Sequence, residues 1–187
     1  ASLVPISFER SANAITIINY EQIKNRSVSS ISELLRDVPG LAVSKSGVRG
    51  SQTQIRVRGS EANHILVLID GIEVNNSAQS DELNWGTLVV ADVERIEVIR
   101  GPQSSMFGSD ALSGLINIIT KNAKNPKSLK IFSEKGSFDT QNNGASIGFR
   151  NGSFDARFGL SQLKTDGDNI SRTGNEKDGY ENKNLTF

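Results

Sequence analysis

The stretch that decides the fold is VERIEVIRGPQSSMFGSDALSGLINIITK, which occupies residues 93–121. Apolar and charged side chains alternate in part over residues 93–99, a pattern that predicts a half-buried strand. Gly101-Pro102 then ends this strand and predicts a short helix with proline at its first position. A second apolar run predicts another strand over residues 115–120. Residues 93–121 therefore predict part of a small sheet with a short connection.

Working outward, the region before this stretch predicts two short helices. Asn19 and Gln22 have the spacing of a capping box, and so do Ser30 and Glu33. Apolar residues at helical spacing follow Ser30, and Pro39-Gly40 supplies a stop. Together with the strands, these helices predict an α+β fold up to about residue 123. The other short strands are expected over residues 15–18, 41–44, 54–58 and 65–69, with a turn at Asp70-Gly71.

The composition changes after residue 126. Phe154, Ala156, Phe158 and Leu160 fall on one side of a segment with a period of two, and a tight turn is expected over residues 150–152. Alternating strands of this kind are a weak signature of a transmembrane β-barrel. An ordinary antiparallel hairpin in a soluble sheet is the alternative. Strands are predicted over residues 130–134, 145–150 and 154–163, with a polar loop over 165–183 and a new strand at 184–187.

Charge and composition exclude several classes of protein. Lys+Arg and Asp+Glu are both 21, so no net field favours nucleic acid. The absence of cysteine excludes a disulfide scaffold and a thiolate metal site. The longest apolar runs, residues 65–69 and 115–119, are too short for a membrane-spanning helix.

Residues suited to catalysis are sparse, and we do not expect an enzyme. His64 is the only histidine, so a catalytic triad or a multi-histidine metal site is not possible. The glycine-rich residues 47–59 precede a strand instead of a helix and have no Lys-Ser/Thr after the last glycine. They therefore do not form a phosphate-binding loop.

Four motifs, in this order, resemble the plug of TonB-dependent outer-membrane receptors. They are ELLRDVPGLAV (33–43), IRVRG (55–59), LVLIDGIEVN (66–75) and the opening stretch over residues 93–121. The resemblance implies a plug domain over residues 8–124, a small mixed sheet with short helices. Residues 126–187 are then expected to be the first antiparallel strands and a loop of an outer-membrane β-barrel that this chain does not complete. The resemblance also implies that the protein lies in the outer membrane of a Gram-negative bacterium and contacts its lipid. TonB is the implied partner, through a segment expected upstream of Ala1.

Within this family, residues 55–75 and 100–120 are most similar to the cobalamin (vitamin B12) transporters. The resemblance implies import of a scarce nutrient, cobalamin in the first place. A ferric siderophore or haem receptor of the same family is the alternative. A soluble binding or adhesion module with a plug-like fold is a further alternative.

The resemblance also implies roles for individual residues. Two polar loops are expected to bind substrate, although polar loops also arise for backbone reasons alone; their residues are Ser51, Gln52, Thr53, Gln54, Asn75, Asn76 and Ser77. Residues implied to hold the plug together and against the barrel are Arg58, Asp70, Arg95, Glu97 and Arg100. No cofactor is expected apart from a possible Ca²⁺, whose implied oxygen ligands are Asp166, Asp168, Glu176 and Asp178. Lys177 interrupts this acidic run and argues against metal binding.

Overall fold

The computed structural model describes residues 14–122, 127–171, 173–174 and 176–187. The chain forms two compact units: unit 1 comprises Ala1–Lys45 and Gln52–Thr120, and unit 2 comprises Ser46–Ser51 and Lys121–Phe187. The predicted domain boundaries at residues 8, 124 and 126 lie outside the described residues, so this division stays a prediction. The assignment of Ser46–Ser51 to unit 2 is a feature that the sequence did not suggest.

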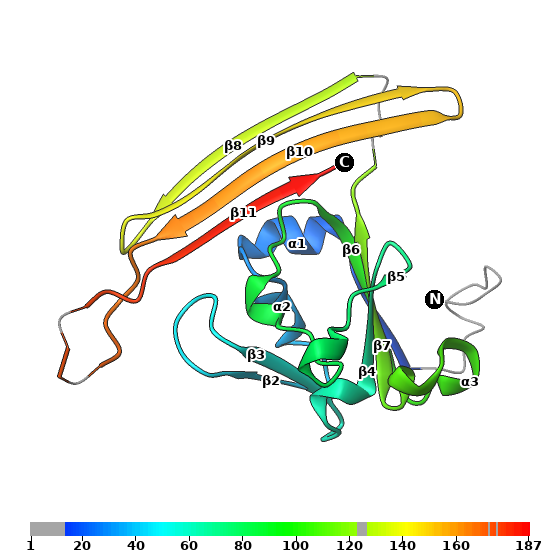
Figure 1. The fold of residues 1–187 in the computed structure, drawn as a ribbon. Helices are drawn as coiled ribbons and strands as arrows, with labels where there is room; N and C mark the ends of the chain where they lie inside the picture. The colour runs from blue at the N-terminus through cyan, green and yellow to red at the C-terminus, as the bar shows by residue number, and fades with distance from the viewer. Residues whose placement is uncertain (1–13, 123–126, 172, 175) are drawn as a thin grey trace. The chain divides into compact units, whose positions relative to one another are not determined.

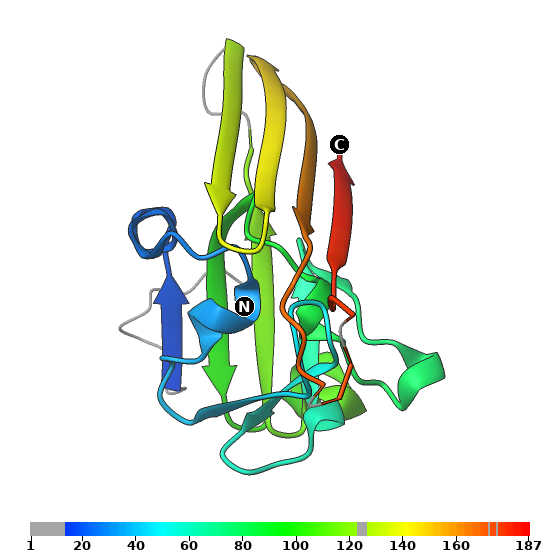
Figure 2. The same cartoon turned by 90° about the vertical axis from the view of Figure 1, so that its left-hand side faces the viewer.

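Unit 1 is built on a five-stranded mixed sheet with the strand order β1-β6-β7-β4-β5 (Figure 1). Strands β4 and β7 pair in parallel, and the other neighbours pair antiparallel. Figure 2 shows β1 in blue beside the green strands β6 and β7. The strands are β1 (Ala14–Ile18), β4 (Ile65–Ile69), β5 (Ile72–Glu73), β6 (Val93–Arg100) and β7 (Gly114–Thr120), and a separate hairpin joins β2 (Leu41–Lys45) to β3 (Thr53–Val57). The strands predicted in this region are confirmed, with ends that differ by one or two residues.

The first helix has the predicted cap, but the second does not. Asn19 Oδ1 accepts a hydrogen bond from Gln22 N at 3.0 Å, and Asn19 N donates to Gln22 Oε1 at 2.9 Å. The predicted capping box at Ser30 is wrong, because its hydroxyl lies 2.7 Å from that of Ser32 and makes no cap hydrogen bond. The α-helices are α1 (Tyr20–Arg26), α2 (Ile31–Leu35) and α3 (Ser104–Phe107), and the 3₁₀ helices are η2 (Ala62–His64), η3 (Ser77–Gln79), η4 (Trp85–Thr87) and η5 (Ser109–Ala111).

The helix after Gly101-Pro102 begins later than predicted. Its first residue is Ser104 and its N-cap is Gln103, so Pro102 does not occupy the first helical position. Gly101 has φ +118°, a backbone conformation that favours glycine, and this residue turns the chain away from β6. The dipeptide therefore ends the strand as predicted but does not start the helix.

The sheet of unit 1 buries both of its faces. On one face, Leu34 and Leu35 of α2 belong to a large apolar cluster with residues of β6 and β7 such as Val98 and Ile116. On the other face, Ala111 of η5 belongs to a smaller cluster with apolar strand residues, and Phe107 packs against it. Successive strand residues point to opposite faces, so β6 and β7 contribute to both clusters. Burial of this apolar surface is the main stabilising contribution to unit 1.

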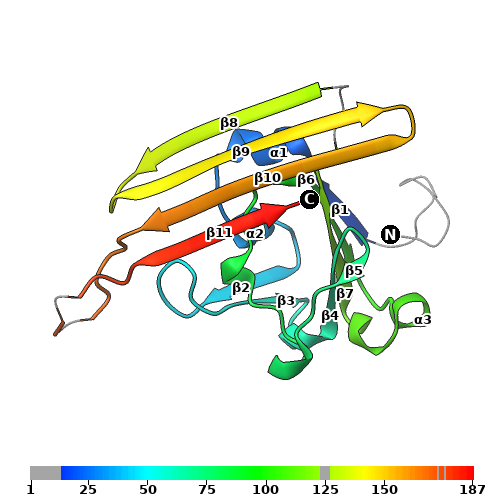
Figure 3. The same cartoon turned by 45° about the horizontal axis from the view of Figure 1, so that its top comes forward.

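Unit 2 contains a four-stranded antiparallel sheet, seen as adjacent strands in Figure 3. The strand order is β11-β10-β9-β8. A two-residue turn at Gly152-Ser153 joins β9 and β10, one position later than the predicted turn. All four strands are longer than predicted, and the polar loop is shorter because β11 begins at residue 180. The strands are β8 (Lys127–Gly136), β9 (Thr140–Asn151), β10 (Phe154–Thr165) and β11 (Tyr180–Thr186).

One face of this sheet is apolar and exposed, and the opposite face is mainly polar. The register places Leu129, Ile147 and Phe158 in one row across three strands, and all three are more than half exposed. On the opposite face, the Phe132 ring covers Gly144, where a Cβ atom would lie 2.4 Å from the ring. The predicted alternation of β10 is therefore confirmed. Among the described residues, no helix is long and apolar enough to cross a membrane.

Candidate functional site

Strand β3 divides the first predicted substrate loop into buried and outward-facing side chains. Thr53 is 1% exposed and points into the interior, whereas Gln54 on the next position faces outward. Gln52 is exposed, and Ser51 is half-buried and belongs to unit 2. In unit 1, the side chains of Gln52 and Gln54 are thus the ones from this loop that can reach a ligand.

The outward side chain of Gln54 links two charged residues. Its Nε2 donates to Glu82 Oε2 at 2.7 Å, and its Oε1 accepts from Arg56 Nη2 at 2.9 Å. Arg56 also lies on β3, whereas Glu82 lies 28 positions away, after the second polar loop. The amide therefore connects the first predicted substrate loop to the segment that follows the second one.

A second hydrogen bond joins the same two segments. Asn84 Oδ1 accepts from Thr53 N at 3.1 Å and from Gly86 N at 3.0 Å. The side chain of Asn84 thus caps η4 and holds the start of β3 at once. The two loops of unit 1 form one connected polar surface.

Asn75 has a supporting position in this surface. Its Oδ1 accepts from Val67 N at 2.8 Å, and its Nδ2 donates to Ile65 O at 2.9 Å and Asp81 O at 2.8 Å. These bonds use the acceptor and both donors of the amide, so Asn75 ties the loop to strand β4.

The rest of the second loop is a closed turn with an exposed tip. Asn76 pairs with Glu82 through an isolated bridge, and its side chain accepts from Ala78 N at 3.1 Å. Ser80 and Asp81 have φ +55° and +59°, which reverses the chain before Glu82. Residues 76–80 are exposed. Asn76 and Ser77 can therefore face a ligand, in contrast to Asn75.

The residues predicted to hold the plug together make contacts inside unit 1. Asp70 accepts from Thr120 N at 2.9 Å and from Thr120 Oγ1 at 2.6 Å, which fastens the Asp70-Gly71 turn to the end of β7. Arg58 has φ +51° and is exposed, and its backbone N–H donates to Gly40 O at 2.7 Å. These contacts are internal to unit 1, and contact with a barrel wall stays a prediction.

The guanidinium of Arg100 makes three hydrogen bonds within unit 1. Its guanidinium donates to Pro39 O at 2.6 Å, Thr16 Oγ1 at 2.9 Å and Ala14 O at 3.2 Å. It therefore joins β6 to β1 and to the turn after α2.

Arg95 and Glu97 form an ion pair on the face of the unit 1 sheet that carries the smaller apolar cluster. Arg95 Nε lies 2.9 Å from Glu97 Oε1, and Asn117 Nδ2 donates to Glu97 Oε2 at 3.5 Å. Burial alone would raise the pKa of Glu97, but the hydrogen bonds from Arg95 and Asn117 and nearby positive charge hold the pKa below its usual value.

The lowered pKa of Glu97 predicts a loss of stability in acid. A carboxyl whose pKa is lower in the folded state stabilises the fold above its usual pKa, and this contribution disappears as the pH falls through the lowered value. We expect Glu97→Gln to flatten this acidic part of the curve of unfolding free energy against pH. Urea unfolding at several acidic pH values measures it, and an unchanged slope in Glu97→Gln would contradict the assignment.

The sequence of this chain matches one protein-family model over most of unit 1. The model is described as the TonB-dependent Receptor Plug Domain, and it covers residues 8–115, more than half of the chain. The chain belongs to this family. The resemblance stated from the four motifs is confirmed, and so is the mixed sheet with short helices expected for a plug.

Among curated proteins, the plug region is similar to the vitamin B12 transporter BtuB of Vibrio vulnificus (strain CMCP6). Identity is 37% over 109 residues, which is 58% of this chain and 18% of that protein. The chain therefore spans less than a fifth of the length of this relative.

Solved structures of siderophore receptors share the fold. The siderophore receptor PirA from Acinetobacter baumannii has a TM-score of 0.70 and 25% identity, over 91% of this chain and 28% of that one. A mutant of the ferric enterobactin receptor PfeA from Pseudomonas aeruginosa has a TM-score of 0.70 and 27% identity, over 91% and 29%. The ferric yersiniabactin uptake receptor FyuA from Yersinia pestis has a TM-score of 0.69 and 23% identity, over 90% and 27%, and supports the fold alone.

The predicted calcium ligands after the plug lie in the loop between β10 and β11. Asp166 accepts from Lys177 Nζ at 2.9 Å, and Asp178 accepts from the backbone of Ile170 at 3.1 Å. Within the part of the chain that the structure describes, no three or more His, Cys, Asp or Glu side chains gather as a metal site would need. Calcium binding stays a prediction, and the present contacts of the loop do not favour it.

The sequence did not reveal Glu82 and Asn84 as members of the plug's polar surface. Asn84 stands two residues before Gly86, a pattern that is compatible with a capped turn. Glu82 has no local pattern that marks it, because its partner Gln54 is 28 positions away. Only the fold brings these two residues together.

Proposed function

We propose that this chain is the plug, with the first barrel strands, of an outer-membrane transporter that binds cobalamin and imports it with TonB. The observation that carries the proposal is the 37% identity to a vitamin B12 transporter over 109 residues. TonB would act through a segment upstream of Ala1, and the location would be the outer membrane of a Gram-negative bacterium.

The polar surface formed by the two loops of unit 1 is suited to a neutral ligand. The exposed tips of its two loops carry amides and hydroxyls, and the two charged groups beside them, Arg56 and Glu82, are joined through Gln54. A corrinoid presents several amides at its rim and suits such hydrogen-bonding groups. The exposed polar residues at these tips are Gln52, Asn76, Ser77, Gln79 and Ser80.

A ferric siderophore is the second candidate ligand. The structural similarity to PirA and PfeA, at 25% and 27% identity, favours it. A ferric catecholate is strongly anionic and needs cationic groups in its site. In unit 1, Arg56 is compensated by the nearby Glu82, and this arrangement favours cobalamin over a catecholate.

The exposed face of the four-stranded sheet supports contact with lipid. Ile131, Leu160 and Leu185 form a second apolar row beside that of Leu129, Ile147 and Phe158. All six are more than half exposed, and the next row is polar, with Ser133, Asn143, Gln162 and Lys183. A band of apolar side chains bounded by polar ones is expected where barrel strands cross a bilayer. A soluble binding or adhesion module would leave this face in water at a high cost in free energy.

The test is calorimetric titration of the full-length protein with cobalamin and, separately, with a ferric catecholate. We expect saturable binding of cobalamin and none of the catecholate at the same concentrations. Strong binding of the catecholate alone would overturn the choice of ligand and leave the family assignment in place.

The Gln54–Glu82 hydrogen bond gives a sharper test of the site. Gln54→Glu places two carboxylates at the position of a 2.7 Å hydrogen bond, so the loops should separate. We expect cobalamin affinity to fall about tenfold, which corresponds to about 1.4 kcal/mol, and the exchange Gln54→Glu with Glu82→Gln to restore most of it. Calorimetric titration measures both variants.

A matched control for this variant lies in unit 2. Gln162 Nε2 donates to Glu181 Oε1 at 2.6 Å on neighbouring strands, so Gln162→Glu also places two carboxylates together, away from the plug loops and beside Lys183, which pairs with Glu181 at 3.0 Å. We expect Gln162→Glu to leave the affinity within about twofold of the unmodified protein. Equal losses in Gln54→Glu and Gln162→Glu would show that the effect is not specific to the loops.

A further inference from the structure

The loop between β10 and β11 carries an excess of acidic residues. Over residues 166–179 the sequence has four carboxylates and two basic residues, Arg172 and Lys177. Four negative charges against two positive ones leave a net charge of about −2, which a divalent cation could balance. Hydrogen bonds and an ion pair within the chain itself balance part of this negative charge.

Three of the four carboxylates of the loop accept hydrogen bonds from the protein. Asp166 Oδ2 accepts from the Lys177 ammonium at 2.9 Å, and Asp178 Oδ2 accepts from Ile170 N at 3.1 Å. Asp168 Oδ1 accepts from Asn169 N at 2.8 Å. Calcium needs six to eight oxygen ligands that converge on one point. Here each of the three carboxylates accepts from a different donor, and the described residues of the loop include no group of three or more acidic side chains that could share one ion.

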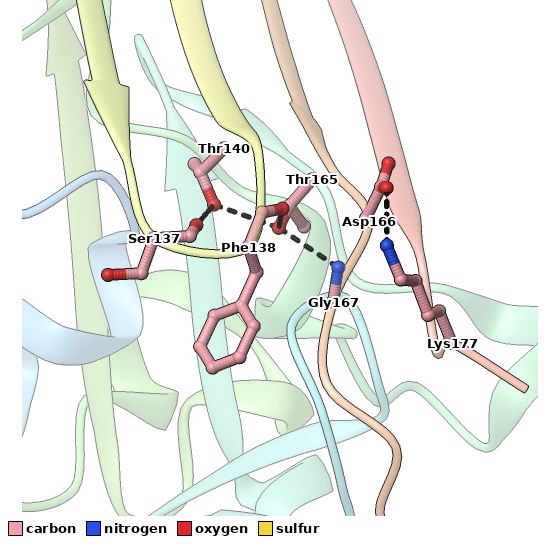
Figure 4. Close-up of polar contacts among 7 residues, drawn as sticks. All are labelled: Ser137, Phe138, Thr140, Thr165, Asp166, Gly167 and Lys177. Atoms are coloured by element: carbon pink, nitrogen blue, oxygen red, sulfur yellow. Dashed lines mark hydrogen bonds and ion pairs between the residues drawn. The ribbon is translucent and has the colours of Figure 1, made fainter. Parts of the chain in front are cut away.

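The base of the loop is fastened by hydroxyl and backbone groups (Figure 4). Thr165, 6% exposed, donates to Phe138 O at 3.2 Å and accepts from Gly167 N at 3.1 Å. The Thr140 hydroxyl lies 2.8 Å from that of Thr165, and Asp166 N donates to Phe138 O at 3.0 Å. These bonds join the end of β10 to the turn between β8 and β9.

The neck of the loop is also narrow. Gly167 has φ +72°, and a Cβ at this position would lie 2.0 Å from Asp178 O. The two sides of the loop therefore approach as closely as a glycine allows. This close approach brings Lys177 next to Asp166.

We propose that Lys177 is the built-in cation of this loop, so that its ammonium, held by Asp166, replaces a divalent ion and the loop keeps its fold without calcium. The Lys177 ammonium lies 2.9 Å from Asp166 Oδ2, so the ion pair compensates one negative charge of the loop within the chain itself. An ammonium at this point also repels Ca²⁺ and so lowers any affinity of the neighbouring carboxylates for the ion. The proposal concerns unit 2 alone and does not depend on the identity of the ligand.

The experiment compares Lys177→Gln with a matched control in the full-length protein. Lys183 forms a similar exposed ion pair with Glu181 at 3.0 Å on β11, outside the loop, so Lys183→Gln removes an equivalent charge. Amide hydrogen exchange over residues 166–179 is measured in two solutions. One contains a chelator that removes calcium, and the other contains about 5 mM CaCl₂, a concentration that fills weak calcium sites. Calorimetric titration with CaCl₂ alone gives the affinity directly.

The unmodified protein and Lys183→Gln are expected to show the same exchange rates in both solutions, within about twofold. Lys177→Gln should exchange about threefold faster in the chelator, as loss of an exposed ion pair implies, and calcium should reverse most of this change. Slower exchange of the unmodified protein in calcium, or micromolar calcium binding by it, would overturn the proposal. So would a Lys177→Gln variant that behaves like Lys183→Gln.

Discussion

Replacing Arg100 by alanine is expected to lower the free energy of unfolding by about 3 kcal/mol. The guanidinium donates three hydrogen bonds, and each bond from a charged donor is worth roughly 1 kcal/mol or more. Its acceptors are Ala14 O, Pro39 O and Thr16 Oγ1, so strand β1 should loosen first. Urea unfolding measures the total loss, and amide hydrogen exchange over β1 locates it.

Arg95→Ala is the matched control for this prediction. Arg95 lies on the same strand, is 46% exposed at its side chain and pairs with Glu97. A partly exposed ion pair contributes at most about 1 kcal/mol. A loss in Arg100→Ala no greater than that in Arg95→Ala would contradict the role of Arg100 as the link between β6, β1 and the turn at Pro39.

Replacing Asn75 by alanine is expected to cost a similar amount, about 3 kcal/mol, for a different reason. The change leaves Val67 N and Ile65 O without their side-chain partner, and Val67 and Ile65 are each 1% exposed. A buried polar group left without a partner costs about 1 to 3 kcal/mol. Asn75→Asp should be at least as damaging, since its carboxylate cannot donate to the carbonyls of Ile65 and Asp81. Urea unfolding of both variants measures these losses.

Asn76→Ala is the control, because Asn76 is exposed and its side chain accepts one hydrogen bond from the loop backbone. We expect it to change the unfolding free energy by less than about 1 kcal/mol. If Asn75→Ala lost ligand affinity at full stability instead, Asn75 would be a ligand contact and not the support for the loop that its hydrogen bonds indicate.

Much of the fold of unit 1 could be predicted because its signals are local. The apolar runs of β4, β6 and β7 and the cap of α1 lie within short segments, and their physical causes act between neighbours in sequence. The false capping box at Ser30 shows the limit of such reasoning. The Ser-x-x-Glu spacing is present, but the Ser30 hydroxyl pairs with Ser32 and does not cap the helix.

The candidate site could be predicted only as two loops. The polar residues around Gln54 and Asn76 mark surface loops by composition, but composition does not separate side chains that face a ligand from those that support the loop. Composition groups Thr53 with Gln54, yet the alternation of β3 buries the Thr53 side chain and turns the half-buried Gln54 side chain outward. Asn75 was grouped with Asn76, yet the hydrogen bonds to β4 occupy its amide.

By itself, the sequence determined that this chain carries a TonB-dependent receptor plug, because the four motifs over residues 33–121 hold the turns, glycines and apolar runs that this sheet requires. The tertiary structure decided which polar residues act together. Gln54 bonds to Glu82, which is 28 positions away, and Thr53 bonds to Asn84, which is 31 positions away. Arg100 bonds to Ala14, which is 86 positions away. Hydrogen bonds depend on distances of about 3 Å in space, and separation along the chain does not reveal which groups the sheet brings that close.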